Sequence, residues 1–219
     1  MQLSICWFTF SRDADLLRVS VSAARRVFPN ARICIFDERR KDLPRSVVDE
    51  LAPDIYRVTD FPRRGNLNGW ECSLGILDCL AEASTGGRRV IKMDSDTMLL
   101  GDTWLYSRDF VGFSTGRGAW CFGMCYAIYP DLLSRLRSTL ESFPKDMMCK
   151  LGEDVLITSH AVFLSERPKI HPANSPLVSW WRPGKDVTGE VVHFDGGGAG
   201  VRSTTPAAAA RRIISMLDK

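Results

Sequence analysis

The sequence lacks a run of apolar residues long enough to cross a bilayer, which takes about 20 such residues. Its first residues, 1–10, are apolar, but they lack the basic segment and the small-residue cleavage site of a secretory signal. We therefore expect neither a membrane-spanning helix nor a leader, and we expect a cytoplasmic location.

A strong excess of one charge is also lacking, because 29 Lys and Arg residues face 26 Asp and Glu residues. The formal charge of +3 is too small to indicate nucleic acid as a partner, and it suits a small polyanion such as a nucleotide diphosphate. Hydrophobic residues make up 45% and charged residues 25%, the balance of a folded globular protein. With neither an internal repeat nor a linker, the 219 residues are expected to form one domain.

The cysteines show no pairing pattern, because they are seven in number and include no CxxC pair. Four of them lie within apolar runs: Cys6, Cys34, Cys72 and Cys79. This pattern indicates reduced, buried thiols and no disulfide framework. Cys121 and Cys125 are four apart, without the second pair of ligands that a zinc site needs.

The first half of the chain alternates strand and helix patterns. Short apolar runs that predict strands cover 3–10, 31–36, 54–58 and 89–93. Helical spacing of apolar residues covers 15–27, 47–51 and 70–83. Strand–helix–strand units of this length predict a parallel sheet.

The second half is less regular. Glycine-interrupted strands are expected within 112–129 and a last strand over 190–194. Helices are expected over 131–140 and 155–164, and an alanine-rich helix from Pro206 onward. The segment 169–181 contains Pro172 and Pro176 and is expected to be a loop.

Asp94-Ser95-Asp96 directly follows the strand expected over 89–93. In open α/β sheets, ligands bind beyond the carboxyl ends of the strands, so these carboxylates stand where chemistry is expected. Two carboxylates one residue apart suit Mg²⁺ or Mn²⁺, which prefer oxygen ligands. The alternative is a strand-to-turn exit in which Asp caps the backbone.

Four motifs carry a resemblance to a known family. The run Arg89–Leu99 resembles the strand and DxD motif of GT-A glycosyltransferases. Residues 120–132 are similar to the glycine–tyrosine strand and helix start of the fringe and β-1,3-galactosyltransferase group. Gly152–Val155 resembles the Glu-Asp-Val motif of that group, and Val191–Phe194 is similar to the C-terminal histidine strand of many GT-A enzymes. The motifs occur in the order in which the family has them.

The resemblance implies an α/β fold of the GT-A, Rossmann-like type, with an open, mixed, mostly parallel sheet flanked by helices. It implies one glycosyltransferase domain over 1–219, with a nucleotide-binding half over about 1–96 and an acceptor-binding half over about 97–219. The implied activity is hexosyltransferase-like: metal-dependent transfer of a sugar from a nucleotide-sugar donor, by default a UDP-sugar, to an acceptor hydroxyl. The acceptor, whether glycan, lipid-linked or protein, stays open.

The resemblance also implies a metal site and a base. Asp94, Asp96 and His193 are the implied ligands of Mn²⁺ or Mg²⁺, although Asp94 would alternatively touch ribose and a strand-end histidine is often structural. Asp154 is the implied general base of an inverting transfer, with Glu153 as the second candidate. Local sequence equally allows an N-cap role for Asp154. His160 and His171 are expected to be structural.

Residues that would contact the nucleotide follow the first strands of the sheet. The resemblance assigns contacts with the base, ribose or phosphates to Thr9, Phe10, Ser11, Arg12, Asp37, Asn66, Asp94 and Ser95. Arg12 would otherwise be a solvated loop residue, and Asn66 a residue of an exposed turn.

Three tryptophans are candidates for an acceptor platform, since aromatic rings pack on the apolar faces of sugars: Trp120, Trp180 and Trp181. Burial in the core is the alternative for each. The C-terminal helix, with Arg211 and Arg212 beside apolar residues, would either touch an anionic membrane surface or dock on its own domain.

Three functions therefore remain besides inverting transfer. These are a retaining GT-A glycosyltransferase, a nucleotidyltransferase on a similar sheet, and a non-catalytic module that binds nucleotide sugars. The segment 11–15 lacks the glycine-rich basic loop that nucleotidyltransferases carry after their first strand.

Overall fold

The structure is a computed structural model that describes residues 2–9, 13–39, 42–61, 69–106, 108–116, 121–148, 150–172, 174–181, 187–194 and 210–211. The predicted nucleotide contacts Phe10, Ser11, Arg12 and Asn66 lie outside these residues, as do Trp120 and the side chain of Trp181. Nearly all of the predicted C-terminal helix also lies outside them.

The chain is built on a seven-stranded sheet with the order β3-β2-β1-β4-β7-β6-β8. Its strands are β1 (Leu3–Thr9), β2 (Arg32–Glu38), β3 (Ile55–Thr59), β4 (Arg89–Asp94), β6 (Phe110–Phe113), β7 (Cys125–Ile128) and β8 (Pro168–His171). Parallel pairs join β3, β2, β1 and β4, whereas β7 is antiparallel to both of its neighbours. Within this sheet β7 alone therefore runs in the opposite direction. The prediction of an open, mixed, mostly parallel sheet is confirmed.

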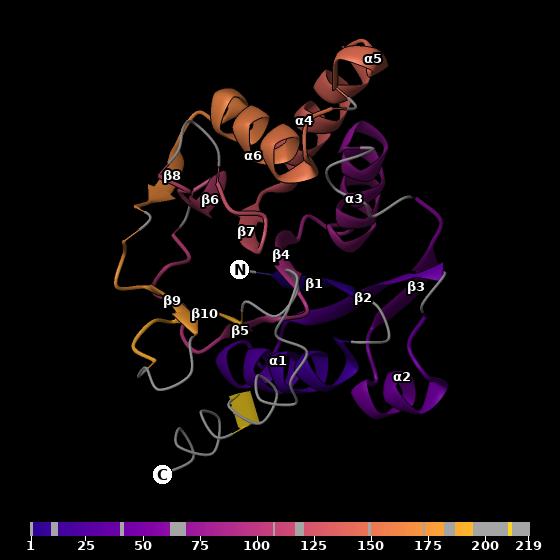
Figure 1. Ribbon diagram of the computed structural model, residues 1–219, viewed down its shortest axis with the longest axis vertical. Coiled ribbons are helices and arrows are strands. Elements are labelled where there is room, and N and C mark those ends of the chain that lie inside the picture. The colour runs from indigo at the N-terminus through magenta and orange to yellow at the C-terminus, as the bar shows by residue number, and fades with distance from the viewer. Residues whose placement is uncertain are drawn as a thin grey trace.

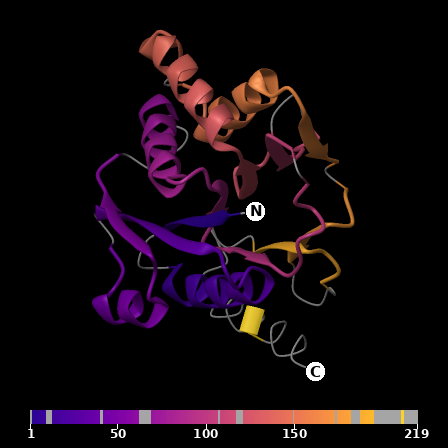
Figure 2. The same ribbon diagram turned by 180° about the vertical axis from the view of Figure 1, so that it is seen from behind.

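Helices cover both faces of this sheet (Figures 1 and 2). One face carries α1 (Ala14–Val27) and α2 (Arg45–Leu51), and the other carries α3 (Gly69–Ala83), α4 (Pro130–Ser142) and α6 (Glu153–Leu164). The short helix α5 (Lys145–Met148) follows α4. The result is a three-layer helix–sheet–helix arrangement, in agreement with the expected α/β class.

The alternation of side chains along β1 explains why both faces are covered. Leu3, Ile5 and Trp7 pack with α1 and α2, whereas Cys6 and Phe8 pack with the helices of the opposite face. All seven residues of β1 are buried. Each large apolar side chain buried in this way stabilises the fold by about 1.5–3 kcal/mol.

A second, three-stranded sheet has the order β5-β10-β9. Its strands are β5 (Thr97–Leu99), β9 (Val178–Trp181) and β10 (Val191–Phe194). Because only Ser95 and Asp96 separate β4 from β5, this small sheet holds the residues after the Asp94-Ser95-Asp96 turn. It lies beside α1 in Figure 1.

The prediction of a loop over 169–181 is wrong. This segment contains most of β8 and all of β9, and β9 pairs in parallel with β10. The prolines Pro172 and Pro176 stand between the two strands and interrupt neither. Trp180 and Trp181 are therefore strand residues.

The six cysteines that the structure describes are buried, and none of these six forms a disulfide with another. Among the described residues, no helix is long and apolar enough to span a membrane.

Candidate active site

The Asp94-Ser95-Asp96 turn lies where the strand order of the large sheet changes direction. From β1 the chain passes through α1 to β2 on one side, whereas β4 pairs with β1 on the other side. Phe8 of β1 is in register with Asp94, and Thr9 is in register with Asp37 of β2. Open α/β sheets bind ligands at such a switch point, beyond the carboxyl ends of the strands.

Lys92 and Asp94 lie on the face of β4 that α3, α4 and α6 cover, because residues two apart in a strand share a face. The Nζ atom of Lys92 is 2.5 Å from Oδ1 of Asp94, and it also donates a hydrogen bond to the main-chain carbonyl of Gly123. The side chain of Lys92 is 5% exposed, whereas that of Asp94 is 39% exposed. A buried ammonium group therefore supports a carboxylate that opens to solvent.

Asp154 lies in the first turn of α6, on the same face of the sheet. Gly152 occupies the N-cap position, so Asp154 is not the N-cap, and its acidic side chain is favoured there by the helix dipole. A methyl group at Gly123 would lie 1.6 Å from Oδ1 of Asp154, so the carboxylate sits directly against the Gly123 backbone. Close approach thus requires glycine at position 123.

The pKa of Asp154 is raised to about 7, above all by burial and further by the charges of Glu153 and Asp94. The positive charge of Lys92 and a hydrogen bond with the Gly123 main chain lower it. A carboxylate with such a pKa can accept a proton near neutral pH. The assignment of Asp154 as the base stays a prediction.

Asp96, the last residue of the turn, lies beside His193, although the two are far apart in the sequence. Oδ1 of Asp96 is 3.5 Å from Nδ1 of His193, and that nitrogen is also 3.0 Å from Oγ1 of Thr97. The pairing of β10 with β5 brings them together, since His193 is in register with Thr97. Burial and the charges of Asp94 and Asp13 raise the pKa of Asp96 well above its usual value.

Asp13 is a member of this site that sequence reasoning missed. Its Oδ2 atom accepts a hydrogen bond from the hydroxyl of Ser95 at 2.7 Å, which ties the turn after β4 to the start of α1. Three carboxylates, those of Asp13, Asp94 and Asp96, thus influence one another at the carboxyl end of β4.

The donor set at this turn fits a divalent cation. Carboxylates and an imidazole are ligands of Mn²⁺ and Mg²⁺, and a cation would offset the negative charges of Asp94 and Asp13, which, after burial, raise the pKa of Asp96. Within the described ranges, however, no three His, Cys, Asp or Glu side chains already converge as a metal site. Asp94 commits Oδ1 to Lys92, so its other oxygen, Oδ2, would have to serve a cation.

The predicted nucleotide contacts that the structure describes lie at the ends of neighbouring strands. Thr9 ends β1 and is buried. The buried carboxylate of Asp37 accepts hydrogen bonds from the Leu43 amide at 2.6 Å and from the Tyr56 hydroxyl at 2.8 Å. Asp37 therefore holds the segment after β2, and its proximity to a base or ribose stays a prediction.

Trp180 of β9 is partly buried and packs against the hydrophobic core. Its ring lies edge-on to Phe122 at 4.8 Å and to His193 at 5.0 Å. Trp180 therefore buttresses the predicted ligand His193, and its role as an acceptor platform stays a prediction. The ring nitrogens of His160 and His171 approach main-chain oxygens of Leu156 and Trp104, as expected of structural histidines.

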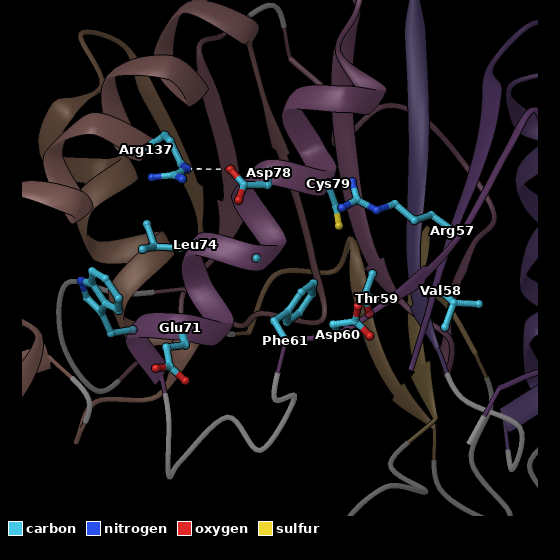
Figure 3. A pocket seen from close by; sticks show the side chains of 12 residues that line it. Arg57, Val58, Thr59, Asp60, Phe61, Glu71, Leu74, Asp78, Cys79 and Arg137 are labelled. Atoms are coloured by element: carbon cyan, nitrogen blue, oxygen red, sulfur yellow. Dashed lines mark hydrogen bonds and ion pairs between the residues drawn. The ribbon is translucent and has the colours of Figure 1, made fainter. Parts of the chain in front are cut away.

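A separate pocket of about 370 Å³ lies between β3 and α3 (Figure 3). None of the predicted site residues lines it. Its charged side chains pair with neighbours: Arg137 with Asp78 at 2.7 Å, and Arg57 with Glu82 at 2.9 Å. Because its charges are matched in this way, this pocket shows no group prepared for chemistry.

The solved structures similar to this one include glycosyltransferases. The galactosyltransferase LgtC, in complex with donor and acceptor sugar analogs, has a TM-score of 0.59 at 14% identity over 97% of this chain and 94% of that chain. A glycosyltransferase involved in glycosylation of the major capsid of PBCV-1 has a TM-score of 0.54 at 11% identity over 99% and 100% of the two chains. The mannosyltransferase PcManGT from Pyrobaculum calidifontis, with GDP-Man and Mn²⁺, has a TM-score of 0.52 at 19% identity over 78% and 55%.

These similarities show the GT-A fold that the sequence predicts. No protein-family profile matches the chain, and comparison with curated protein sequences gives no significant match.

Proposed function

We propose that this protein transfers a sugar from a nucleotide-sugar donor to an acceptor hydroxyl with the help of Mn²⁺ or Mg²⁺. The observation that carries the proposal is the meeting of Asp94, Asp96, His193 and Asp154 around the carboxyl end of β4. These residues come from three separate parts of the sequence, and the fold brings them to the position where α/β sheets bind ligands.

The metal would be held by Asp96 and His193, with Asp94 as a further ligand or as a contact to ribose. A bound divalent cation neutralises the negative charge that develops on a departing nucleoside diphosphate. Complexes of PcManGT with GDP-Man and Mn²⁺ support this kind of donor and metal. UDP is the nucleotide we favour, with Thr9, Asp37 and Ser95 among its contacts.

Asp154 would act as the general base of an inverting transfer, and Glu153 is the neighbouring carboxylate. An acceptor hydroxyl must lose a proton as it attacks the anomeric carbon, and a carboxylate with a pKa of about 7 can take that proton. The direct product of such a transfer has the opposite anomeric configuration. NMR analysis of the product would identify a retaining enzyme instead.

The proposal is tested with a panel of nucleotide sugars, each with and without Mn²⁺, by calorimetric binding and by slow donor hydrolysis. We expect at least one donor to bind only with the metal, and Asp96→Asn to weaken Mn²⁺ binding. Asp102→Asn, which alters an exposed loop carboxylate, is the matched control. If no donor binds and Asp96→Asn leaves the Mn²⁺ affinity unchanged, the proposal is wrong.

A further inference from the structure

Lys92 is an unusual residue for the middle of a buried strand. Its neighbours in β4, Val90, Ile91 and Met93, are fully buried apolar residues, and the Lys92 residue itself is 4% exposed. Burying an ammonium group costs several kcal/mol, roughly, unless good partners surround it. The sequence pattern of β4 would be satisfied by an apolar residue at this position, so the partners of Lys92 explain its presence.

Those partners come from β4 itself, from the turn before β7, and from β7. Nζ of Lys92 bonds to Oδ1 of Asp94 in its own strand, and to the carbonyl oxygen of Gly123 just before β7. The ring of Tyr126, opposite Lys92 on β7, lies 6.0 Å from Nζ. Lys92 therefore joins β4 to the start of β7 through its side chain as well as through the sheet.

Gly123 extends this connection to Asp154. Its main chain bonds to the Asp154 carboxylate, and its missing Cβ leaves the space into which that carboxylate fits. Lys92 thus anchors the carbonyl of the residue whose backbone holds Asp154. The contacts form a chain in which Asp94 bonds to Lys92, Lys92 bonds to Gly123, and Gly123 bonds to Asp154.

We propose that Lys92 is a positioning residue that fixes the Asp154 carboxylate relative to Asp94 through the Gly123 backbone. The inference rests on the proposed function, because it gives Lys92 the task of setting the distance between the donor end and the acceptor end of the site. In this role Lys92 acts on the site through Gly123 and Asp94. Its removal leaves Asp96 and His193 intact and releases Asp94 from an ion pair, so donor and metal binding persist while the base loses its position.

The test is Lys92→Met, which keeps the length of the side chain and removes its charge and donor. We expect a folded protein that keeps its affinity for Mn²⁺ and donor but hydrolyses the donor about 100-fold more slowly, since misplacement by about 1 Å costs that much. Lys145→Met is the matched control, because Lys145 is an exposed lysine that pairs with Glu71 on the surface. It should leave hydrolysis unchanged.

A second measurement does not depend on turnover. In ¹H–¹⁵N NMR spectra, Lys92→Met should shift the amide resonances of Gly123 and Asp154, whereas Lys145→Met should not. If the wild-type protein binds no donor, the proposed function fails, yet this comparison still decides whether Lys92 positions Asp154.

Four results would overturn the inference. Hydrolysis at the wild-type rate, or an unmoved Gly123 resonance, would show that Asp154 keeps its place without Lys92. A parallel loss of binding and turnover would give Lys92 a role in binding the donor. If Lys92→Met does not fold, Lys92→Leu replaces it, since it also removes both the charge and the hydrogen-bond donor to the Gly123 carbonyl. Failure of both variants to fold would assign Lys92 to folding instead.

Discussion

Two buried cations on one strand, Arg89 and Lys92, have opposite surroundings. Arg89 begins β4 at the end far from the site, where it donates to the Tyr106 carbonyl at 2.6 Å and lies 4.8 Å from the centre of the Tyr129 ring. Burial lowers the pKa of Arg89 to about 10. Burial also lowers the pKa of Lys92, but the carboxylates around it, Asp94 first, outweigh that effect and raise it.

The difference shows where this fold concentrates negative charge. At the amino end of β4 the Arg89 cation meets an aromatic face, one main-chain carbonyl and the charge of one carboxylate, Asp109. At the carboxyl end a cation of similar burial is surrounded by Asp94, Asp154 and Glu153. Packing alone does not require that many carboxylates, and perturbed groups of this kind cluster at functional sites.

The largest effect is expected at Asp154. Asp154→Asn removes the base but preserves size, so we expect turnover to fall about 10²–10⁴-fold while donor binding and folding are retained. Steady-state kinetics with the donor identified in the binding panel would measure this. Asp131→Asn is the control, because Asp131 occupies the same second position in its own helix, α4, and is exposed. Activity near the wild-type level in Asp154→Asn would remove the base assignment.

Gly123→Ala should have the next largest effect. The added methyl group meets Oδ1 of Asp154 at 1.6 Å, so the carboxylate must move, and overpacking of this kind costs about 1–3 kcal/mol. We expect lower stability in urea melts together with a loss of turnover. Gly86→Ala provides the contrast, because Gly86 has a positive φ of 80° but no atom within 4 Å of its added methyl group. That variant should lose some stability and no activity.

The pH dependence of the rate tests the charges around Asp154. Because the base must be ionised and its pKa is about 7, the rate should fall by about tenfold per unit below that pH and level off above it. Lys92 lowers the pKa of Asp154, so in Lys92→Met the fall of the rate on the acidic side should begin at a higher pH. Arg89→Met should leave it in place. If the rate falls at the same pH in both variants as in the wild type, the arrangement described for the site is contradicted.

The smallest effect is expected for Arg89→Met. Replacing a buried cation that lacks a bonded carboxylate by an apolar side chain is often neutral or stabilising, so we expect stability within about 1 kcal/mol of the wild type and unchanged turnover. Urea melts and the donor assay measure both. A large loss of activity would mean that Arg89, at the amino end of β4, also contributes to turnover.

Much of the first half of the chain, residues 1–96, was predictable because its elements are local. The apolar run that forms β4 and the acidic turn after it are adjacent in the sequence, and the structure places both as expected. The helix beginning beside Asp154 was predicted on the same grounds. Such patterns depend on neighbours within one strand or one helical turn.

The missed residues depend on contacts between distant segments. Lys92 meets Gly123 across 31 positions, and Ser95 meets Asp13 across 82. A hint for Lys92 was present, since a lysine two residues before Asp94 shares its face in an otherwise apolar strand. The strand around Trp180 was missed because the prolines before it suggested a loop, whereas its pairing with β10 overrides that preference.

The single reversed strand, β7, has a consequence for how the chain is made. During synthesis, β4 emerges before the residues that form β7, so until 125–128 leave the ribosome it is an unpaired edge of the growing sheet. Edge strands with unsatisfied backbone groups invite pairing with other chains, and charged side chains on them oppose it. Lys92 carries a charge on one face of β4, the strand that forms this edge. The same ammonium group that the finished protein encloses would thus protect the nascent sheet from association while its partner strand is still missing.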